Sequence, residues 1–221
     1  AAESHVTNSL EDAAPFLRTN IDGTRNMLEA AARARVPHFI HVSTDEVFGS
    51  APPGVAYGLN DTLRPGNFYA ASKAAAEAMV HAVAHTRGYA ATIVRCTNNY
   101  GPRQHVEKAI PTWIHAALSG QPLPIHGDGR AIRDWLFVDD FARGLVMLME
   151  HPPGGVHHFT GGSPLTNSQV ARRVAGELGG VLLHVDERPG HDARYDLDDA
   201  RTRRDLGWAP TVPFAEGLSR T

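Results

Sequence analysis

The stretch HFIHVSTDEVFG, residues 38–49, joins a short apolar run to two adjacent acids. The run HFIHVS is partly β-branched and lies between Pro37 and a loop rich in Gly and Pro, which predicts a buried strand over 38–43. Asp45 and Glu46 follow directly, so we expect them at the tip of that strand. Because α/β proteins place their chemistry at strand tips, the pair is a candidate site, although solvated loop acids have the same sequence pattern.

Helical and strand-like segments alternate on both sides of this stretch. Apolar side chains on one helical face predict a helix over 15–36 ahead of it and a second helix over 68–86 behind it, ended by Gly88. The same patterns predict further helices over 107–119, 139–150 and 167–178, and strands over 91–96, 123–126, 133–137, 156–160 and 181–185. Strands that alternate with helices indicate an α/β fold with a doubly wound parallel sheet.

The composition is that of a globular chain with balanced charge. Its 221 residues suit one large domain, or a main domain with a smaller lobe, and 42% of them are hydrophobic, enough to bury a core. A net charge of −3 predicts no nucleic-acid or membrane partner from bulk electrostatics. No apolar run has the length of a membrane span, and the start AAESHVTNSL lacks the basic and apolar segments of a signal peptide. The single cysteine, Cys96, excludes an internal disulfide and predicts a reducing, cytoplasmic location.

The second predicted helix begins with YAASK, which places Tyr69 and Lys73 four residues apart on one helix face. The chain contains nineteen arginines and only two lysines, Lys73 and Lys108, so a lysine at this position departs from the usual choice of cation. An ammonium group beside a phenol lowers the pKa of the phenol, so Tyr69 is a candidate acid or base for a hydroxyl group. A chance Tyr-x-x-x-Lys is the alternative.

The thirteen histidines raise the question of a metal site. No set of them shows zinc-like spacing, and we predict no metal. His81 and His85 share a helix face but lack the neighbouring Glu of a zinc-protease helix, so we expect them to be exposed. We expect His157 and His158 in a strand.

Several longer motifs occur in a fixed order along nearly the whole chain. They are AAESHV, TNIDGT, STDEVFG, YAASKA, NNYGP, EKAIP, IRDWLFVDD, RPGHDARY and LGW. This ordered set resembles the extended short-chain dehydrogenase/reductases of the NAD-dependent epimerase/dehydratase family, and among them the dTDP-glucose 4,6-dehydratases. The Thr-Asp-Glu triplet carries the distinction, because the related sugar-nucleotide epimerases and decarboxylases lack the adjacent acid pair.

The resemblance implies a mechanism for the acid pair. Tyr69, helped by Lys73, would take the proton of the glucose 4-hydroxyl while C4 passes a hydride to NAD. Glu46 would then take the C5 proton, and Asp45 would protonate the departing 6-hydroxyl. Crowded carboxyls push their pKa values apart, which suits one ionised and one protonated acid. Thr44 would hydrogen-bond the reacting 4-oxygen.

Other matched positions are, by the same resemblance, binding residues. The implied cofactor-binding residues are Ser4, His5, Thr44, Tyr69, Lys73 and Asn98. The implied substrate-binding residues are Asn98, Asn99, Lys108, Arg133, Arg188 and His191, in which the arginine forks suit a diphosphate. From the residues alone, NNYGP is equally typical of a turn, and any one arginine is typical of a surface.

The sequence departs from the family in two places. It contains no Gly-x-x-Gly-x-x-Gly loop for the cofactor pyrophosphate, and it has Asn67 and Phe68 where the family more often has Ser-Pro. We therefore expect an N-terminally truncated chain that lacks roughly 70–90 residues, about two to three βα units, and is inactive alone. The predicted fold is a partial Rossmann-type sheet with a smaller substrate lobe. The partial NAD-binding domain is residues 1–97 with 131–150 returning to it, and the lobe is 98–130 with 151–221.

The predicted function is dehydration of a nucleotide-activated hexose, dTDP-glucose to dTDP-4-keto-6-deoxyglucose, with NAD as cofactor. A sugar-nucleotide 4-epimerase needs no acid pair and is the alternative enzyme. A non-catalytic protein that has lost its cofactor is the alternative from another class, and the missing glycine loop favours it. Many alanines follow Tyr69, more than one core face needs, so we predict a homodimer through this helix and helix 15–36, as in the family.

Overall fold

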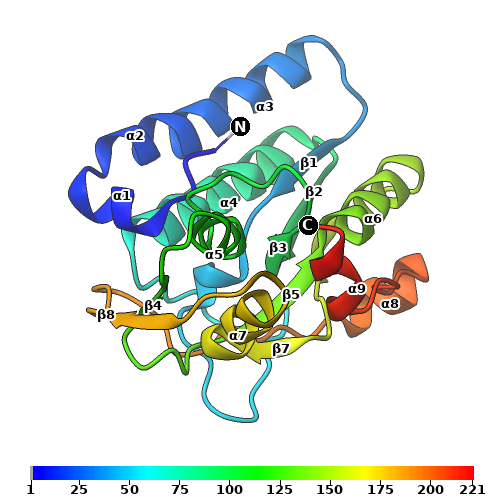
Figure 1. Cartoon of the computed structure of the whole chain (residues 1–221). Coiled ribbons are helices and arrows are strands. Elements are labelled where there is room, and N and C mark those ends of the chain that lie inside the picture. Colours follow the sequence, from blue (N-terminus) through cyan, green and yellow to red (C-terminus); the bar gives the residue numbers. More distant parts are fainter. Residues whose placement is uncertain (1) are drawn as a thin grey trace.

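A three-stranded parallel sheet forms the main part of the structure, a computed structural model that describes residues 2–221 (Figure 1). Its strands are β1 (Phe39–Val42), β2 (Ala91–Cys96) and β6 (Gly155–Phe159), in the order β1-β2-β6. Phe39 pairs with Ala91 at one end, and Cys96 pairs with Phe159 at the other. The predicted α/β class with parallel strands is confirmed.

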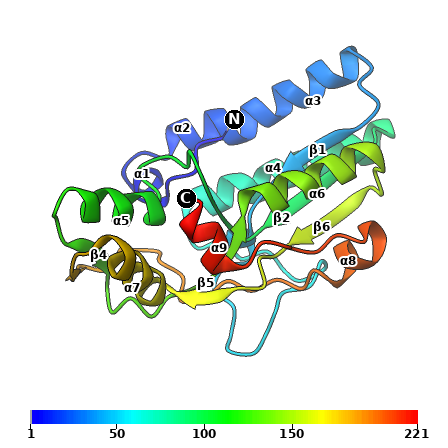
Figure 2. The ribbon, with the colours of Figure 1, turned by 45° about the vertical axis from the view of Figure 1, so that its right-hand side comes forward.

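Helices cover both faces of this sheet. Ile93 points to one face, where it packs with Leu28 of α3 (Gly23–Arg33) and Val80 of α4 (Phe68–Arg87). Its neighbour Val94 points to the other face, against α6 (Val138–Glu150). Because adjacent side chains of a strand alternate between faces, one strand supplies both cores. Figures 1 and 2 show α3 and α4 side by side along one edge of the molecule.

The predicted helix over 15–36 is interrupted. It consists of α2 (Ala14–Phe16), the π-helical segment η1 (Leu17–Asp22) and α3, and a separate helix α1 (Val6–Glu11) precedes it. Within η1 the buried Asn20 donates to the carbonyl of Glu3 at 2.9 Å and to the Ser72 hydroxyl at 2.8 Å. The wider π turn thus turns a polar side chain inward, between the start of the chain and α4. Hydrophobic periodicity does not distinguish such a turn from an α-helix.

A smaller lobe lies beside this sheet. It contains β3 (Asn98–Tyr100), β4 (Leu123–His126), β5 (Ile132–Phe137), β7 (Pro164–Thr166), β8 (Leu182–Val185), α5 (Ala109–Leu118), α7 (Asn167–Leu178) and α9 (Phe214–Ser219), whereas α8 (Ala200–Leu206) packs on β6 of the main sheet. β5 pairs parallel with β3 and antiparallel with β7, and β4 pairs with β8. Trp113, Trp135 and Val170 belong to one buried cluster of this lobe, beneath α5 and α7.

Two features differ from the sequence prediction. The prediction assigned 151–221 to the smaller lobe, but β6 pairs with β2, because α6 packs on the main sheet and returns the chain to it. It assigned 131–150 to the main domain, where α6 does pack on the main sheet, but β5 pairs with β3 and β7 of the smaller lobe. The short elements α1, β3, β7 and α8 were not predicted, since three to seven residues carry little periodicity.

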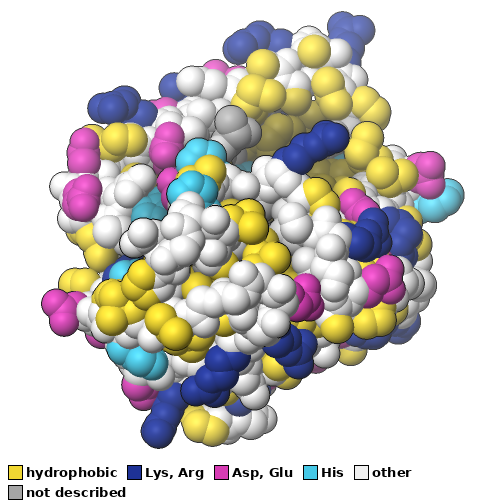
Figure 3. All heavy atoms as spheres, viewed as in Figure 1, with side chains coloured by type: hydrophobic (Ala, Val, Ile, Leu, Met, Phe, Trp, Pro, Cys, Tyr) yellow, Lys and Arg dark blue, Asp and Glu magenta, His cyan; other side chains and the backbone are white. Residues whose placement is uncertain are grey.

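The outer edge of β1 borders an apolar surface. Within the described residues β1 pairs only with β2. Val42 on β1, Met27 on α3 and Met149 on α6 are exposed by 38%, 62% and 70%. In Figure 3, hydrophobic side chains gather around a hollow at the upper right, where Figure 1 shows α3, β1 and α6. Such an edge offers unpaired backbone groups to another strand. Among helices of residues 2–221, none has the length and apolar character that a bilayer crossing requires.

Candidate active site

The acid pair lies where the sequence predicted it, directly after β1. The chain turns there into a short 3-10 helix, η2 (Asp45–Phe48), which Thr44 caps by accepting the Glu46 amide N–H at 3.3 Å. The Thr44 hydroxyl donates to Asp45 Oδ1 at 3.1 Å. Asp45 is 3% exposed, and its Oδ2 has no hydrogen-bond partner within residues 2–221. The reading of this pair as solvated loop acids is therefore excluded for Asp45.

Burial and the neighbouring charged groups act differently on the pKa values of the two acids. Burial, followed by the neighbouring charge of Glu46, raises the pKa of Asp45 to about 8. Burial also raises the pKa of Glu46, but the Arg133 guanidinium and the Asn67 side chain oppose that rise. At neutral pH Asp45 therefore keeps its proton, and Glu46 is the better placed of the two to accept one.

Helix α4 presents Tyr69 and Lys73 next to these acids. The Asn67 side chain caps its start by accepting the Ala70 N–H at 2.8 Å, and Gly88, in the left-handed region with φ 62°, ends it. The Lys73 ammonium donates to the carbonyl of Val42 at 2.5 Å, which holds α4 against the end of β1. The spacing in sequence therefore places Tyr69 and Lys73 on one helix face, and the Lys73 contact is one of those that join α4 to the sheet.

The structure corrects one expectation about this pair. Burial, with the charge of Glu46 next, raises the pKa of Tyr69 well above 10, and burial lowers the pKa of Lys73. The Lys73 ammonium donates to the Val42 carbonyl, and burial is the largest influence on the pKa of the phenol. The Tyr69 ring lies edge-on to Phe16, with ring centroids 6.5 Å apart.

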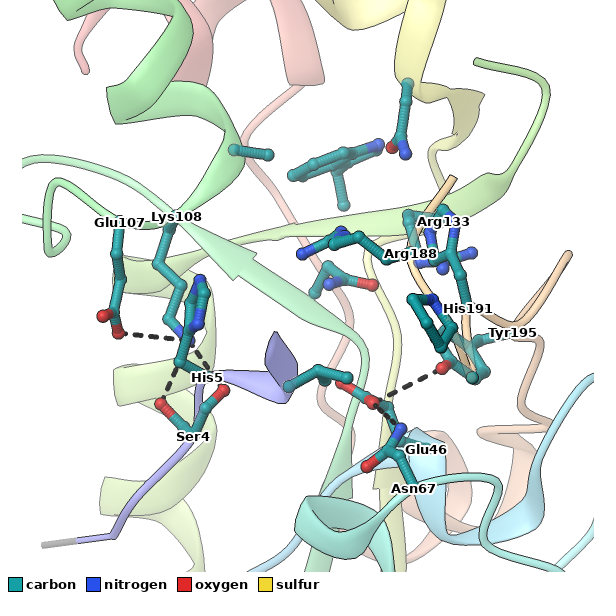
Figure 4. A pocket seen from close by; sticks show the side chains of 17 residues that line it. Ser4, His5, Glu46, Asn67, Glu107, Lys108, Arg133, Arg188, His191 and Tyr195 are labelled. Carbon is teal, nitrogen blue, oxygen red and sulfur yellow. Dashed lines mark hydrogen bonds and ion pairs between the residues drawn. The ribbon is translucent and has the colours of Figure 1, made fainter. Parts of the chain in front are cut away.

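A pocket of about 140 Å³ opens beside the acids (Figure 4). The predicted site residues that line it are Ser4, His5, Glu46, Asn98, Lys108, Arg133, Arg188 and His191. Thr44, Asp45, Tyr69, Lys73 and Asn99 do not line it. Sequence reasoning missed Asn67, Glu107, Trp135, Asn167 and Tyr195, which do. Tyr195 closes the motif RPGHDARY, and Asn67 marks a departure from the family pattern, so both carried a usable signal.

One wall of the pocket joins the start of the chain to α5. Lys108, the residue before α5, donates to the Ser4 carbonyl at 2.8 Å and lies 3.1 Å from the Ser4 hydroxyl. Its ammonium is 3.7 Å from a carboxylate oxygen of Glu107. His5 caps α1 by accepting the Asn8 N–H at 3.4 Å. Burial lowers the pKa of Lys108.

Two guanidinium groups form the opposite wall. Arg133 lies over the Tyr195 ring, 4.3 Å from its centroid, and donates to the Asp192 carbonyl at 2.8 Å. Arg188 reaches the same pocket, and its buried Nε has no partner within residues 2–221. His191 binds Glu187 at 2.7 Å through Nδ1. Figure 4 shows these side chains across the pocket from Lys108, an arrangement of cations that suits a diphosphate.

The floor of the pocket is a shared set of hydrogen bonds at Glu46. Its Oε2 lies 3.4 Å from the Asn67 amide nitrogen and 3.4 Å from the Tyr195 hydroxyl. The Tyr195 hydroxyl donates to Asp192 Oδ2 at the shorter distance of 2.8 Å. Figure 4 shows Glu46, Asn67 and Tyr195 converging from three parts of the chain.

The two asparagines of NNYGP separate. Asn98 lines the pocket, and its buried Oδ1 has no partner within residues 2–221. Asn99 turns back on the chain, where its amide donates to the Thr97 carbonyl at 3.2 Å and to Cys96 Sγ at 3.1 Å. The binding prediction therefore has geometric support for Asn98, whereas Asn99 acts in the turn.

The histidines do not gather. In residues 2–221 no three His, Cys, Asp or Glu side chains lie together as metal ligands. His81 and His85 are exposed on α4, as expected. His157 and His158 are fully buried in β6, which confirms the strand prediction.

The chain is similar to several known proteins. Residues 1–160 match the model of the NAD dependent epimerase/dehydratase family. The dTDP-glucose 4,6-dehydratase of Streptomyces niveus is 44% identical over all of this chain and 67% of its own length. The solved structure of DesIV, a dTDP-glucose 4,6-dehydratase from Streptomyces venezuelae with NAD and TYD bound, is 41% identical with a TM-score of 0.97, over all of this chain and 70% of that one. The UDP-glucose 4-epimerase of Thermus thermophilus, in complex with NAD, is 28% identical with a TM-score of 0.94, over all of this chain and 74% of that one.

The fold and these matches define a Rossmann-type α/β protein of the kind that uses NAD. The chain belongs to the NAD dependent epimerase/dehydratase family. The expected fold class and family are thereby confirmed.

The raised pKa of Asp45 predicts a pH-dependent effect on stability. In the unfolded chain the carboxyl ionises near 3.8, whereas in the folded protein it ionises near 8. Folding therefore favours the protonated form, and the contribution to stability, complete below pH 3.8, is lost as the pH rises through 8. We expect Asp45→Asn to raise the Tm, more at pH 8 than at about pH 5. An equal Tm difference at both pH values in thermal melts would argue that Asp45 is not held protonated.

Proposed function

We propose that this chain carries the catalytic and sugar-binding side chains of an NAD-dependent dTDP-glucose 4,6-dehydratase. The observation that carries the proposal is the pair formed by a buried Asp45 that holds its proton and an adjacent Glu46 that opens to the pocket. An elimination needs one group to take a proton and another to give one. Similarity to proteins named dTDP-glucose 4,6-dehydratase supports the same reaction.

The ends of β1 and β2 suit one half of NAD. Ser43 Oγ and Asn98 Oδ1 are buried there with no partner within residues 2–221, so the site has polar atoms for a ligand to satisfy. When bound, NAD would supply the hydride acceptor for C4 and the hydride donor for C6, and Glu46 would return to C5 the proton that it had taken. We assign Ser4, His5, Thr44, Tyr69, Lys73 and Asn98 to holding it. The sequence has no Gly-x-x-Gly-x-x-Gly for the pyrophosphate, so we expect the chain alone to bind NAD weakly.

The first proton transfer falls to Tyr69. Its phenolate form would take the proton of the 4-hydroxyl, and the Lys73 ammonium would stabilise that form once it turns from the Val42 carbonyl. Thr44 would donate a hydrogen bond to the 4-oxygen once its hydroxyl turns from Asp45 Oδ1. The resulting 4-ketone makes the neighbouring C5 proton acidic.

The acid pair then removes water. Glu46 takes the proton from C5, and the electron pair of that C–H bond forms the double bond between C5 and C6. The C6–O bond breaks, and Asp45 gives its proton to the departing hydroxyl, which leaves as water. The raised pKa of Asp45 supplies that proton at neutral pH.

The basic walls of the pocket would bind the nucleotide part of the substrate. Lys108 on one side and Arg133 and Arg188 on the other converge on one space, where two phosphate groups can each meet a cation. His191 completes the Arg133 side. Of the other predicted substrate residues, Asn98 is assigned to NAD, and Asn99 is left out because its amide binds the chain itself.

A product assay tests the function. We expect full-length protein, incubated with dTDP-glucose and NAD, to form a 4-keto-6-deoxy sugar nucleotide, detected by NMR of the sugar C6 methyl group. A 4-epimer as the product would instead support the epimerase alternative. The chain is also similar to a UDP-glucose 4-epimerase, so the assay must distinguish the two products. No turnover by a folded protein would support the non-catalytic alternative. The buried, free Cys96 suits the reducing cytoplasm, where we place the enzyme.

We predict that the intact protein is a homodimer built on α4 and α3. Ala71, Ala78 and Ala82 leave an exposed small-residue surface on α4, and Met27 is 62% exposed on α3. Small side chains let two helices approach closely, so Ala78→Arg should convert the dimer to monomer in sedimentation velocity. The matched control is Ala215→Arg on the exposed side of α9, which should leave the dimer intact. A wild-type monomer at micromolar concentration would refute the prediction.

A further inference from the structure

Asn67 makes two contacts with the two ends of one carboxamide. Its Oδ1 accepts the Ala70 N–H at 2.8 Å and so caps α4, while its Nδ2 points at Glu46 Oε2, 3.4 Å away. The side chain is 8% exposed, so solvent does not compete strongly for either end. Because the cap fixes the oxygen, the nitrogen has little choice of direction.

The other donor near this oxygen is already engaged. The Tyr195 hydroxyl also lies 3.4 Å from Glu46 Oε2, but it has one hydrogen and directs it to Asp192 Oδ2 at 2.8 Å. Among the described residues, the Asn67 amide is therefore the donor left for this oxygen of Glu46.

We propose that Asn67 is a positioning residue for Glu46, in which the helix cap of α4 fixes a carboxamide that aims and holds the reacting carboxylate. The proposal rests on the proposed function, in which Glu46 takes the C5 proton. It ties the orientation of the base to the N-cap residue of the helix that carries Tyr69. The two proton-transfer groups would then move as one unit.

A donor to the carboxylate also favours its ionised form. The other groups that face Glu46 act in both directions. Arg133 from β5, Lys108 before α5 and Arg188 from the loop after β8 favour ionisation of Glu46. The charge of Asp192 opposes it. The charge of Glu46 in turn raises the pKa values of Asp45 in η2, Tyr69 and Tyr195. Removing the amide donor leaves those groups in place, so its effect on the pKa of Glu46 can be isolated.

The chemistry of residue 67 offers matched variants. Asn, Asp and Ser cap a helix about equally well, so Asn67→Asp and Asn67→Ser should keep the fold. Ser lacks the second arm that reaches Glu46, and Asp replaces the donor with a like charge. If Asn67 were only a cap, neither change would reach Glu46.

The test is a ¹³C NMR titration of the Glu46 carboxyl in this chain, assigned by the signal that Glu46→Gln removes. We expect the pKa of Glu46 to shift upward in Asn67→Ser and further upward in Asn67→Asp, with thermal melts close to wild type. An unchanged pKa in Asn67→Ser would overturn the proposal, and this variant decides the question if Asn67→Asp does not fold. The titration needs neither substrate nor cofactor, so its outcome is independent of whether the enzyme is a dehydratase.

A kinetic cycle in full-length protein gives a second readout. Asn67→Ser should slow loss of the C5 proton about tenfold with an unchanged KM, the effect of one lost hydrogen bond to a charged group. Added to Glu46→Gln, the same change should cost nothing more, because the base is already gone. An equal loss in both backgrounds would contradict a role through Glu46.

Discussion

Glu46→Gln is expected to slow loss of the C5 proton by about 10²–10⁴-fold, the usual contribution of a general base. Formation of the 4-keto sugar should persist, because Tyr69 and Lys73 are unchanged and the amide is nearly isosteric. The unreacted 4-keto glucose nucleotide should therefore accumulate. Reduction with borodeuteride places deuterium at C4 of that species, and absence of the C6 methyl signal shows that elimination has stopped.

Two companion variants order the steps. Tyr69→Phe should block formation of the 4-keto sugar, since no group then takes the 4-hydroxyl proton. Asp45→Asn should allow the ketone to form but prevent loss of water, since an amide cannot protonate the departing hydroxyl. If Glu46→Gln and Tyr69→Phe stop at the same stage, or if Glu46→Gln turns over normally, the acid pair does not perform the elimination.

Glu77→Ala is expected to destabilise the fold by about 3–5 kcal/mol, because it leaves a buried guanidinium without its partner. Arg95 on β2 binds Glu77 on α4 through Nη2 at 2.7 Å and through Nε at 3.1 Å, and the two side chains are 5% and 2% exposed. Arg95 also lies over the Phe48 ring at 4.7 Å and donates to the Leu59 carbonyl at 3.3 Å. Urea unfolding measures the loss of free energy.

Two controls make the result specific. The double variant Glu77→Leu/Arg95→Met removes both charges, and we expect it to regain most of the lost stability, because apolar residues of similar volume often replace a buried pair without cost. Glu29→Gln breaks an exposed pair with Arg25 and should change stability by less than about 1 kcal/mol. A double variant as unstable as Glu77→Ala would mean that packing, and not the unpaired charge, causes the loss.

The sequence alone determined the local features of the site. A short, partly β-branched apolar run predicted β1, and an apolar helical face that ends at Gly88 predicted α4, so the acids after β1 were predicted at a strand tip. The spacing of Tyr69 and Lys73 placed them on one helix face. These predictions succeed because a strand repeats every two residues and a helix about every 3.6, so neighbours in sequence fix direction. The shortest elements and the π turn at Asn20 were not predicted, because too few residues carry the hydrophobic periodicity of each element.

Only the tertiary structure decided which residues share the pocket and how they are charged. Lys108 meets Ser4 across 104 positions, and Tyr195 meets Glu46 across 149. No periodicity encodes such contacts, since they depend on how the sheets and helices pack. Burial likewise raises the pKa of Asp45 to about 8, which sequence can suggest only as one of two outcomes for an acid pair. Desolvation depends on every atom that surrounds the carboxyl, and those atoms come from distant parts of the chain.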